Sequence, residues 1–177
     1  GARCLDGSSY FYYLRVASEP TTRWVFVLMG GGLCVTDADC AQRKKSVLGS
    51  NSSEYWQANF TPGANIYTSL GATDLLSGSA EANPHFHSAN AVFLPYTTGD
   101  VWTGTQTEES EFNYAGHNNL RATIAHLNAT RGLGAATHVL WSGYSSGGFG
   151  VFMTADVARE RWLPARALVK AAPVSGM

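Results

Sequence analysis

Residues 137–162 carry the pattern that most restricts the fold of this chain. The run "THVLW" at 137–141 has the β-branched and aromatic content of a short buried strand. Glycines and serines fill 142–150, and apolar residues then recur at helical spacing at Val151, Ala155 and Ala158. The segment therefore predicts a strand, a sharp turn and a helix. Inside the turn, residues 143–147 ("GYSSG") match G-x-S-x-G only with Ser145 at the centre.

A serine on a tight strand-to-helix turn suits nucleophilic chemistry. Its backbone is strained and its hydroxyl is exposed, and flanking glycines leave room for a substrate carbonyl. The next amide, that of Ser146, begins the helix and can donate to a developing oxyanion. A Gly/Ser-rich phosphate loop or a plain helix N-cap would fit the same letters. Ser145 is the candidate nucleophile.

The remaining chain alternates between the two kinds of element. Apolar runs predict strands, and helical spacing predicts helices at 113–131 and 148–162 with helical patches around 41–48. The expected strands are 10–16, 23–29, 89–96, 137–142 and 166–172. This order predicts an α/β-hydrolase-like three-layer sandwich, with a mostly parallel sheet covered on both faces. We interpret residues 1–177 as the N-terminal part of one catalytic domain, truncated at its C-terminus, because Met177 closes the chain just after an apolar strand.

A second glycine-rich turn follows the early strand at 23–29. That strand runs directly into Gly30, Gly31 and Gly32. Hydrolase folds of this type place further oxyanion donors on such a turn, upstream of the nucleophile. An ordinary flexible turn would have the same composition. The two glycine-rich turns together favour acyl transfer.

Charge and hydropathy exclude two classes of partner. The net charge is −1, and the one basic cluster is Arg43-Lys44-Lys45, which argues against nucleic acid. No apolar run approaches the roughly 18 residues that span a bilayer. No cofactor or metal site is predicted.

Three sequons and three cysteines bear on the compartment. Asn51, Asn59 and Asn128 each begin an N-x-[ST] motif. Cys34 and Cys40 are close enough to form a disulfide, although two reduced thiols or a metal pair would have the same spacing. Cys4 has no evident partner. We expect a secreted, extracellular glycoprotein.

Five blocks occur in an order typical of one family. They are "RCLDGS" at 3–8, "FVLMGGGLC" at 26–34, "NPHFHSANAVFLPY" at 83–96, "GDVWTG" at 99–104 and "SGYSSGGFG" at 142–150. The series resembles the pectin acetylesterase/Notum family of secreted carboxylesterases. The resemblance implies an α/β-hydrolase fold with a Ser-Asp-His triad and Ser145 as its nucleophile. It also implies an oxyanion hole formed by the amides of Gly31, Gly32 and Ser146, and a disulfide between Cys34 and Cys40.

The chain departs from the family pattern at two positions. Leu33 replaces the tryptophan that Notum-like members carry in the oxyanion loop, and Thr97 replaces the cysteine that pairs with the early cysteine, here Cys4. We therefore expect acetyl groups on a polysaccharide such as pectin, ahead of the palmitoleoyl-protein substrate of Notum. A non-catalytic carbohydrate-binding relative is a further alternative. Trp102 is the candidate for lining a substrate groove.

The acid and base of a triad have no evident candidates in this chain. In the α/β-hydrolase order they follow the serine, yet no histidine follows Ser145, and the acids that do, Asp156 and Glu160, lie on its helix. A serine without a base is a weak nucleophile. We therefore expect the acid and base beyond Met177 and expect these 177 residues alone to be inactive. An alternative is a permuted triad using an earlier histidine, His117 or His138.

Overall fold

The computed structural model describes residues 1–52, 54, 56, 74–106, 108 and 110–176. Five strands form one sheet in the order β1-β3-β2-β4-β5. Strand β1 pairs antiparallel with β3, and the other neighbours are parallel. The strands are β1 (Tyr13–Arg15), β2 (Arg23–Leu28), β3 (Asn90–Leu94), β4 (His138–Tyr144) and β5 (Leu168–Val174). The predicted mostly parallel sheet is confirmed.

The central strands are apolar because both of their faces are covered. Five of the six residues of β2 and all five of β3 are buried. On one face, Phe26 of β2 lies against Trp141 of β4, with ring centroids 5.0 Å apart. The Trp141 indole also donates to the Thr154 hydroxyl of helix α5 at 3.1 Å, which ties the sheet to that helix.

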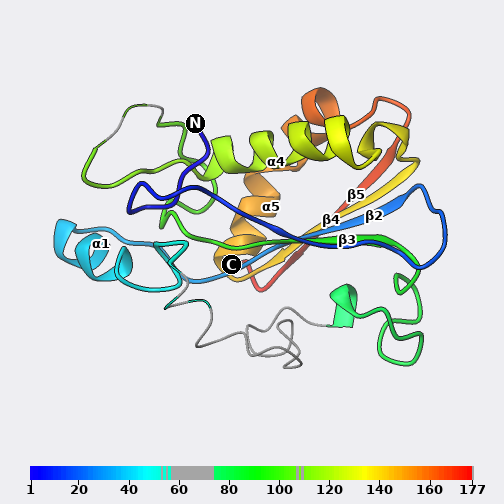
Figure 1. The fold of residues 1–177 in the computed structure, drawn as a ribbon, viewed down its shortest axis with the longest axis horizontal. Helices are drawn as coiled ribbons and strands as arrows, with labels where there is room; N and C mark the ends of the chain where they lie inside the picture. The colour runs from blue at the N-terminus through cyan, green and yellow to red at the C-terminus, as the bar shows by residue number, and fades with distance from the viewer. Residues whose placement is uncertain (53, 55, 57–73, 107, 109, 177) are drawn as a thin grey trace.

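The helices lie mainly on one side of the sheet (Figure 1). They are α4 (Gly116–Thr130), α5 (Ser146–Val157) and the π-helical turn η3 (Ala158–Trp162), while the short turn η1 (Asp74–Leu76) lies on the opposite side. A 3₁₀ turn, η2 (Leu133–Ala135), connects α4 to β4. Helix α1 (Asp37–Arg43) lies beyond the end of the sheet. Among the described residues, no helix combines the length and apolarity needed to cross a bilayer.

Helix α1 begins earlier than the sequence pattern predicts. It spans Asp37–Arg43, whereas the apolar spacing suggested helical patches around 41–48. The Thr36 hydroxyl accepts a hydrogen bond from the Asp39 amide at 3.2 Å, which fixes the start of the helix. Asp37 and Asp39 in the first turn suit the positive end of the helix dipole. Capping and charge, rather than apolar periodicity, therefore place this helix.

Candidate active site

Ser145 stands at the junction of β4 and α5. Its backbone has φ 54° and ψ −125°, outside the regions that L-residues favour, and its side chain is exposed. The Ser145 amide donates to the Val174 carbonyl of β5 at 2.9 Å. A strained serine presented at the carboxyl end of a central parallel strand has the geometry of a nucleophile elbow.

The glycines around Ser145 are needed for close packing. A Cβ on Gly147 would overlap the Leu28 carbonyl oxygen of β2, and a Cβ on Gly143 would lie 2.6 Å from the Gly147 carbonyl oxygen. A Cβ on Gly30 would lie 2.9 Å from the Ser145 Cβ. Side chains at these positions would push the turn away from the end of β2. The glycine-serine pattern is thus explained by contact between two neighbouring strand ends.

Ser146 is the less suitable of the two serines. It begins α5 and is 4% exposed. Its hydroxyl is buried and has no hydrogen-bond partner among the described residues. Its amide lies in the first turn of the helix, where N–H groups have no intrahelical acceptor. Ser146 therefore offers an amide to the site, while Ser145 offers the hydroxyl.

The glycine turn after β2 lies beside this elbow. Leu28 pairs with Gly143, so both strands end at the same edge of the sheet. The Gly30 backbone hydrogen-bonds the Tyr144 hydroxyl, whose pKa is raised to about 12, mainly by burial. Gly31 and Gly32 have φ values of 154° and 69°, and their amides donate to no acceptor among the described residues. The turn next to Ser145 therefore carries two amides that have no acceptor within the part of the chain that the structure describes.

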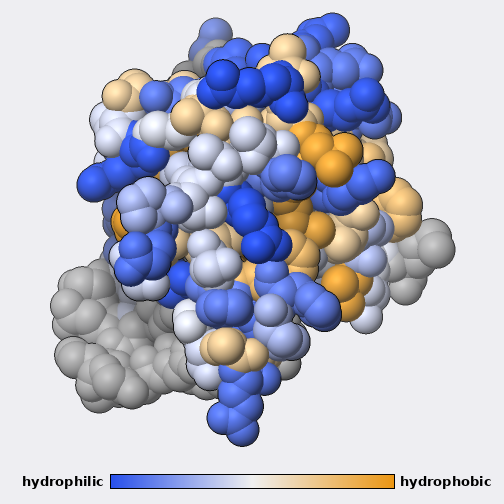
Figure 2. All heavy atoms as spheres, turned by 90° about the vertical axis from the view of Figure 1, so that its right-hand side faces the viewer, coloured by the Kyte–Doolittle hydropathy of each residue, from blue (hydrophilic) through white to orange (hydrophobic). Residues whose placement is uncertain are grey.

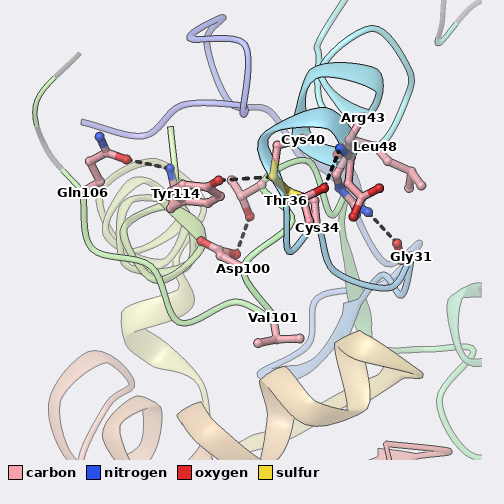
Figure 3. Close-up of a disulfide and its surroundings, with 12 residues drawn as sticks. Gly31, Cys34, Thr36, Cys40, Arg43, Leu48, Asp100, Val101, Gln106 and Tyr114 are labelled. Carbon is pink, nitrogen blue, oxygen red and sulfur yellow. Dashed lines mark hydrogen bonds between the residues drawn. A yellow bond between two sulfur atoms is a disulfide. The ribbon is translucent and has the colours of Figure 1, made fainter. Parts of the chain in front are cut away.

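A disulfide closes the far side of this turn (Figure 3). Cys34 and Cys40 are bonded, with their Cα atoms 5.2 Å apart, so the predicted pairing is present. The Cys34 amide donates to the Gly99 carbonyl at 3.1 Å, and Cys40 Sγ lies 3.2 Å from the Tyr114 hydroxyl. The disulfide thus connects the end of the glycine turn to α1, and the Cys34 amide connects it to the loop after β3.

Comparison with known proteins fits this geometry. The model of the pectinacetylesterase family matches residues 1–177. The chain belongs to the pectinacetylesterase family.

Curated relatives of this pectinacetylesterase-family chain are named carboxylesterases. The palmitoleoyl-protein carboxylesterase notum1 of Xenopus laevis is 35% identical over 159 residues, which cover 89% of this chain and 30% of the relative. The human palmitoleoyl-protein carboxylesterase NOTUM is 33% identical over 160 residues, again covering 89% and 30%. This chain therefore spans about 30% of the length of these relatives.

A solved structure gives the same fold. The Wnt deacylase Notum from Drosophila superposes with a TM-score of 0.76 at 28% identity, covering 97% of this chain and 49% of the other. The predicted α/β-hydrolase-like architecture is therefore confirmed for this family member.

The structure corrects the assignment of Trp102 as a groove residue. Trp102 is 0% exposed, and its indole donates to the Met29 carbonyl at 3.2 Å. Its ring stacks on Tyr96, with centroids 5.2 Å apart. Trp102 is a core residue that supports the chain between β2 and the glycine turn. The sequence alone did not distinguish a core tryptophan from one that lines a groove.

The five histidines of this family member make their contacts away from Ser145. His117 lies against Trp162, with centroids 4.9 Å apart, and His138 Nδ1 lies 3.0 Å from the Thr137 hydroxyl. His87 Nδ1 lies near the Asn83 carbonyl, the His85 ring lies near Phe86, and the His126 ring lies near Tyr12. These contacts do not support a permuted triad with His117 or His138.

The surface at the opposite end of the sheet carries hydrophobic residues among hydrophilic ones (Figure 2). A shallow apolar hollow there lies near the starts of the parallel strands, with basic groups among its lining residues, Arg23, Trp24, Phe86, His138, Val139, Leu140, Leu168 and Lys170. Ligands of open parallel sheets bind at the carboxyl ends of the strands instead. The described residues also contain no cluster of three His, Cys, Asp or Glu side chains suited to a metal ion. The candidate site is the edge that carries Ser145.

Proposed function

We propose that this chain carries the nucleophile and the oxyanion hole of a serine carboxylesterase. The observation that supports this most is the strained, exposed Ser145 next to the glycine turn, where the amides of Gly31 and Gly32 donate to no acceptor in the described part of the chain. Attack on an ester carbonyl by the Ser145 hydroxyl would place negative charge on the carbonyl oxygen. The amides of Gly31, Gly32 and Ser146 would stabilise that charge, as preorganised donors do in acyl transfer.

The test uses the full-length protein and the two adjacent serines. Ser145→Ala should abolish p-nitrophenyl acetate hydrolysis and fluorophosphonate labelling, because Ser145 carries the exposed serine hydroxyl of the turn. Ser146→Ala is the matched control and should keep both, because its hydroxyl is buried. Retained labelling in Ser145→Ala, together with loss in Ser146→Ala, would reverse the assignment.

We infer that the acid and base of the triad come from sequence outside these 177 residues. The histidine contacts described above support this, as does the share of the relatives that the chain spans. Without a base to take the proton, the Ser145 hydroxyl is a weak nucleophile. The 177-residue chain should therefore hydrolyse no ester at a rate above background, whereas the longer protein should.

The first substrate candidate is an acetyl ester of a polysaccharide such as pectin. The second is a longer acyl chain on a protein, favoured by the names of the curated relatives and by apolar side chains near the elbow. Leu33 and Phe149 are 58% and 46% exposed, one on the glycine turn and one on the first turn of α5. A series of p-nitrophenyl esters from acetyl to hexadecanoyl separates the candidates by which chain length gives the highest kcat/KM.

The burial of the tryptophans argues against the carbohydrate-binding alternative. Such a module needs exposed aromatic rings, yet Trp24, Trp56, Trp102 and Trp141 are at most 5% exposed. Trp162 is partly covered and lies against His117. Pull-down on pectin with the Ser145→Ala protein would test it.

We also propose an extracellular location. The Cys34–Cys40 disulfide supports it, since such bonds persist in oxidising compartments. Asn51 and Asn128 are exposed, as glycan acceptors must be, whereas Asn59 lies outside the described residues. Expression in a eukaryotic secretory host should give a mass decrease on glycosidase treatment, and two free thiols at Cys34 and Cys40 would contradict the proposal.

A further inference from the structure

Arg43 contacts the glycine turn directly. It is the last residue of α1, and sequence alone groups it with Lys44 and Lys45 as a surface basic cluster. Its Nη1 donates to the Gly31 carbonyl at 2.8 Å, and its Nε donates to the Leu48 carbonyl at 3.0 Å. The guanidinium lies over the Tyr96 ring, 4.9 Å from the centroid. Figure 3 shows the side chain reaching from α1 toward Gly31.

The charge on Arg43 is largely withdrawn from solvent and is bonded to neutral groups. Burial lowers its pKa, while Tyr96 and Asp100 raise it. An arginine remains protonated under such conditions. The nearby Asp100 carboxylate accepts from Gly116 at 2.7 Å and Trp102 at 3.1 Å, so its bonds are directed elsewhere. Arg43 Nη2 is buried with no partner among the described residues. A positive charge therefore lies beside the turn that must stabilise an anion.

The peptide between Gly31 and Gly32 links Arg43 to the proposed oxyanion hole. The Gly31 carbonyl and the Gly32 N–H belong to one planar trans unit, so they point in opposite directions. A cation bonded to the carbonyl fixes that plane and polarises the N–H as a donor, because hydrogen bonds in series strengthen one another. We propose that Arg43 is a positioning residue that orients and polarises the Gly32 amide toward the oxyanion.

The surroundings of the turn support this role. A Cβ on Gly31 would lie 2.8 Å from Leu48 Cδ2 and 3.3 Å from both Arg43 Nη2 and Tyr96 Cδ1, so the turn is packed on this side. A Cβ on Gly32 would meet nothing within 4 Å. The turn is thus held from the α1 side and open on the other. The planar fork of arginine bonds two carbonyls at once, which a lysine ammonium does not reproduce.

This inference rests on the proposed esterase function, and the test separates the two. In the full-length protein, Arg43→Gln and Arg43→Lys are compared with Lys44→Gln. The control removes the same charge as Arg43→Gln from a side chain that bonds Glu111 at 3.4 Å. Fluorophosphonate titration counts active sites, so kcat is measured per folded site. A trifluoromethyl ketone, whose adduct carries the oxyanion, reports on the hole itself.

We expect both Arg43 variants to lose about 10- to 100-fold in kcat, with KM within about twofold of wild type. This loss is smaller than the ~10²–10³-fold loss in kcat that follows removal of one oxyanion-hole donor, because the Gly32 amide is still present. The ketone Ki should rise by the same factor as kcat/KM falls, and Lys44→Gln should match wild type. Unchanged kcat in a folded variant, or a lower kcat with an unchanged ketone Ki, would overturn the role of Arg43. Absence of Ser145-dependent turnover in the wild type would instead overturn the proposed function.

Discussion

At the residue scale, the same glycine-to-alanine substitution should destabilise the protein much more at Gly147 than at Gly32. Gly147→Ala places a methyl group against the Leu28 carbonyl of β2, which cannot move without breaking the sheet. We expect a loss of about 3 kcal/mol or more in the free energy of unfolding. Gly32→Ala meets open space and bears only the strain of φ 69°, which costs about 1–2 kcal/mol.

Urea denaturation of the full-length variants measures both glycine effects. A Gly147→Ala protein as stable as Gly32→Ala would show that the contact between the elbow and β2 is looser than described. The positive φ of Gly32 also means that Gly32→Pro would deform the turn as well as remove its N–H, because proline fixes φ near −65°. Alanine is therefore the cleaner probe of this turn.

Single residues also show where sequence reasoning stops. Ser145 can be singled out from the sequence because only Ser145 fits the centre of G-x-S-x-G. The structure explains the two glycines of that motif, since both lie too close to neighbouring backbone to carry a side chain. Trp102 and Arg43 carry no such local signal. Whether a tryptophan is buried, or an arginine reaches a carbonyl twelve residues away, depends on segments that meet only after folding. The strained, exposed serine of the turn was therefore predictable, and its role as a nucleophile stays a prediction. The contacts that support the turn were not predictable.

At the element scale, helix α1 depends on its disulfide. The bond closes a short loop, which stabilises the folded state by about 2 kcal/mol in the chain-entropy model. Replacing Cys34 and Cys40 together by serine should lower stability by about that amount. It should also lower kcat, because α1 carries Arg43 to the Gly31 carbonyl.

A double-mutant cycle checks that link between the disulfide and the turn. When Arg43→Gln is added to the double serine variant, the loss in kcat should be smaller than in the wild-type background, since the contact is already weakened. Fully additive losses would contradict a shared route through α1.

The sequence predicts some helices and strands more closely than others. Strands β2 and β3 are predicted closely because continuous apolar runs identify buried parallel strands. Strand β1 keeps only three of its seven expected residues, Tyr13–Arg15, because it pairs with one neighbour at the edge. Helix α5 begins two residues earlier than its apolar spacing indicates, because glycines fill its first turn.

At the scale of the whole molecule, the N-terminal segment is held to the end of β3 without a covalent bond. The Leu5 amide donates to the Thr97 carbonyl at 2.8 Å. Cys4 is a buried free thiol whose pKa is raised to about 11 by burial, against an opposing, lowering contribution from the Thr97 side chain. Thr97→Cys should therefore form a disulfide with Cys4. The closed loop is long, so the chain-entropy model gives a gain in stability of about 4–5 kcal/mol.

Thiol titration of the unfolded, unreduced protein tests this bond, with Thr97→Ser as the control. The cysteine variant should show no free thiol from this pair and should lose its added thermal stability in reductant. Two titratable thiols in Thr97→Cys would mean that the side chains do not approach closely enough.

A buried thiol and a buried tyrosine hydroxyl make the stability of the fold sensitive to high pH. Burial raises the pKa of Cys4 from 9.0 to about 11 and that of Tyr144 from 10.0 to about 12. Above pH 9 the unfolded chain releases protons that the folded chain still holds. The free energy of unfolding is therefore unaffected by these groups below pH 9 and falls as the pH rises above it. For Cys4 the two-unit shift corresponds to about 2–3 kcal/mol by pH 11.

The free energy of unfolding, measured in urea at intervals from pH 8 to 11, should therefore decline in the wild type from about pH 9. Cys4→Ala removes the group that titrates first, so its decline should begin nearer pH 10, where unfolded tyrosines release their protons. Tyr144→Phe serves as the comparison, because it should leave the early part of the decline unchanged. If Cys4→Ala and the wild type declined in parallel from pH 9, the thiol would have to be open to water, and the packing of the N-terminal segment against Thr97 would be wrong.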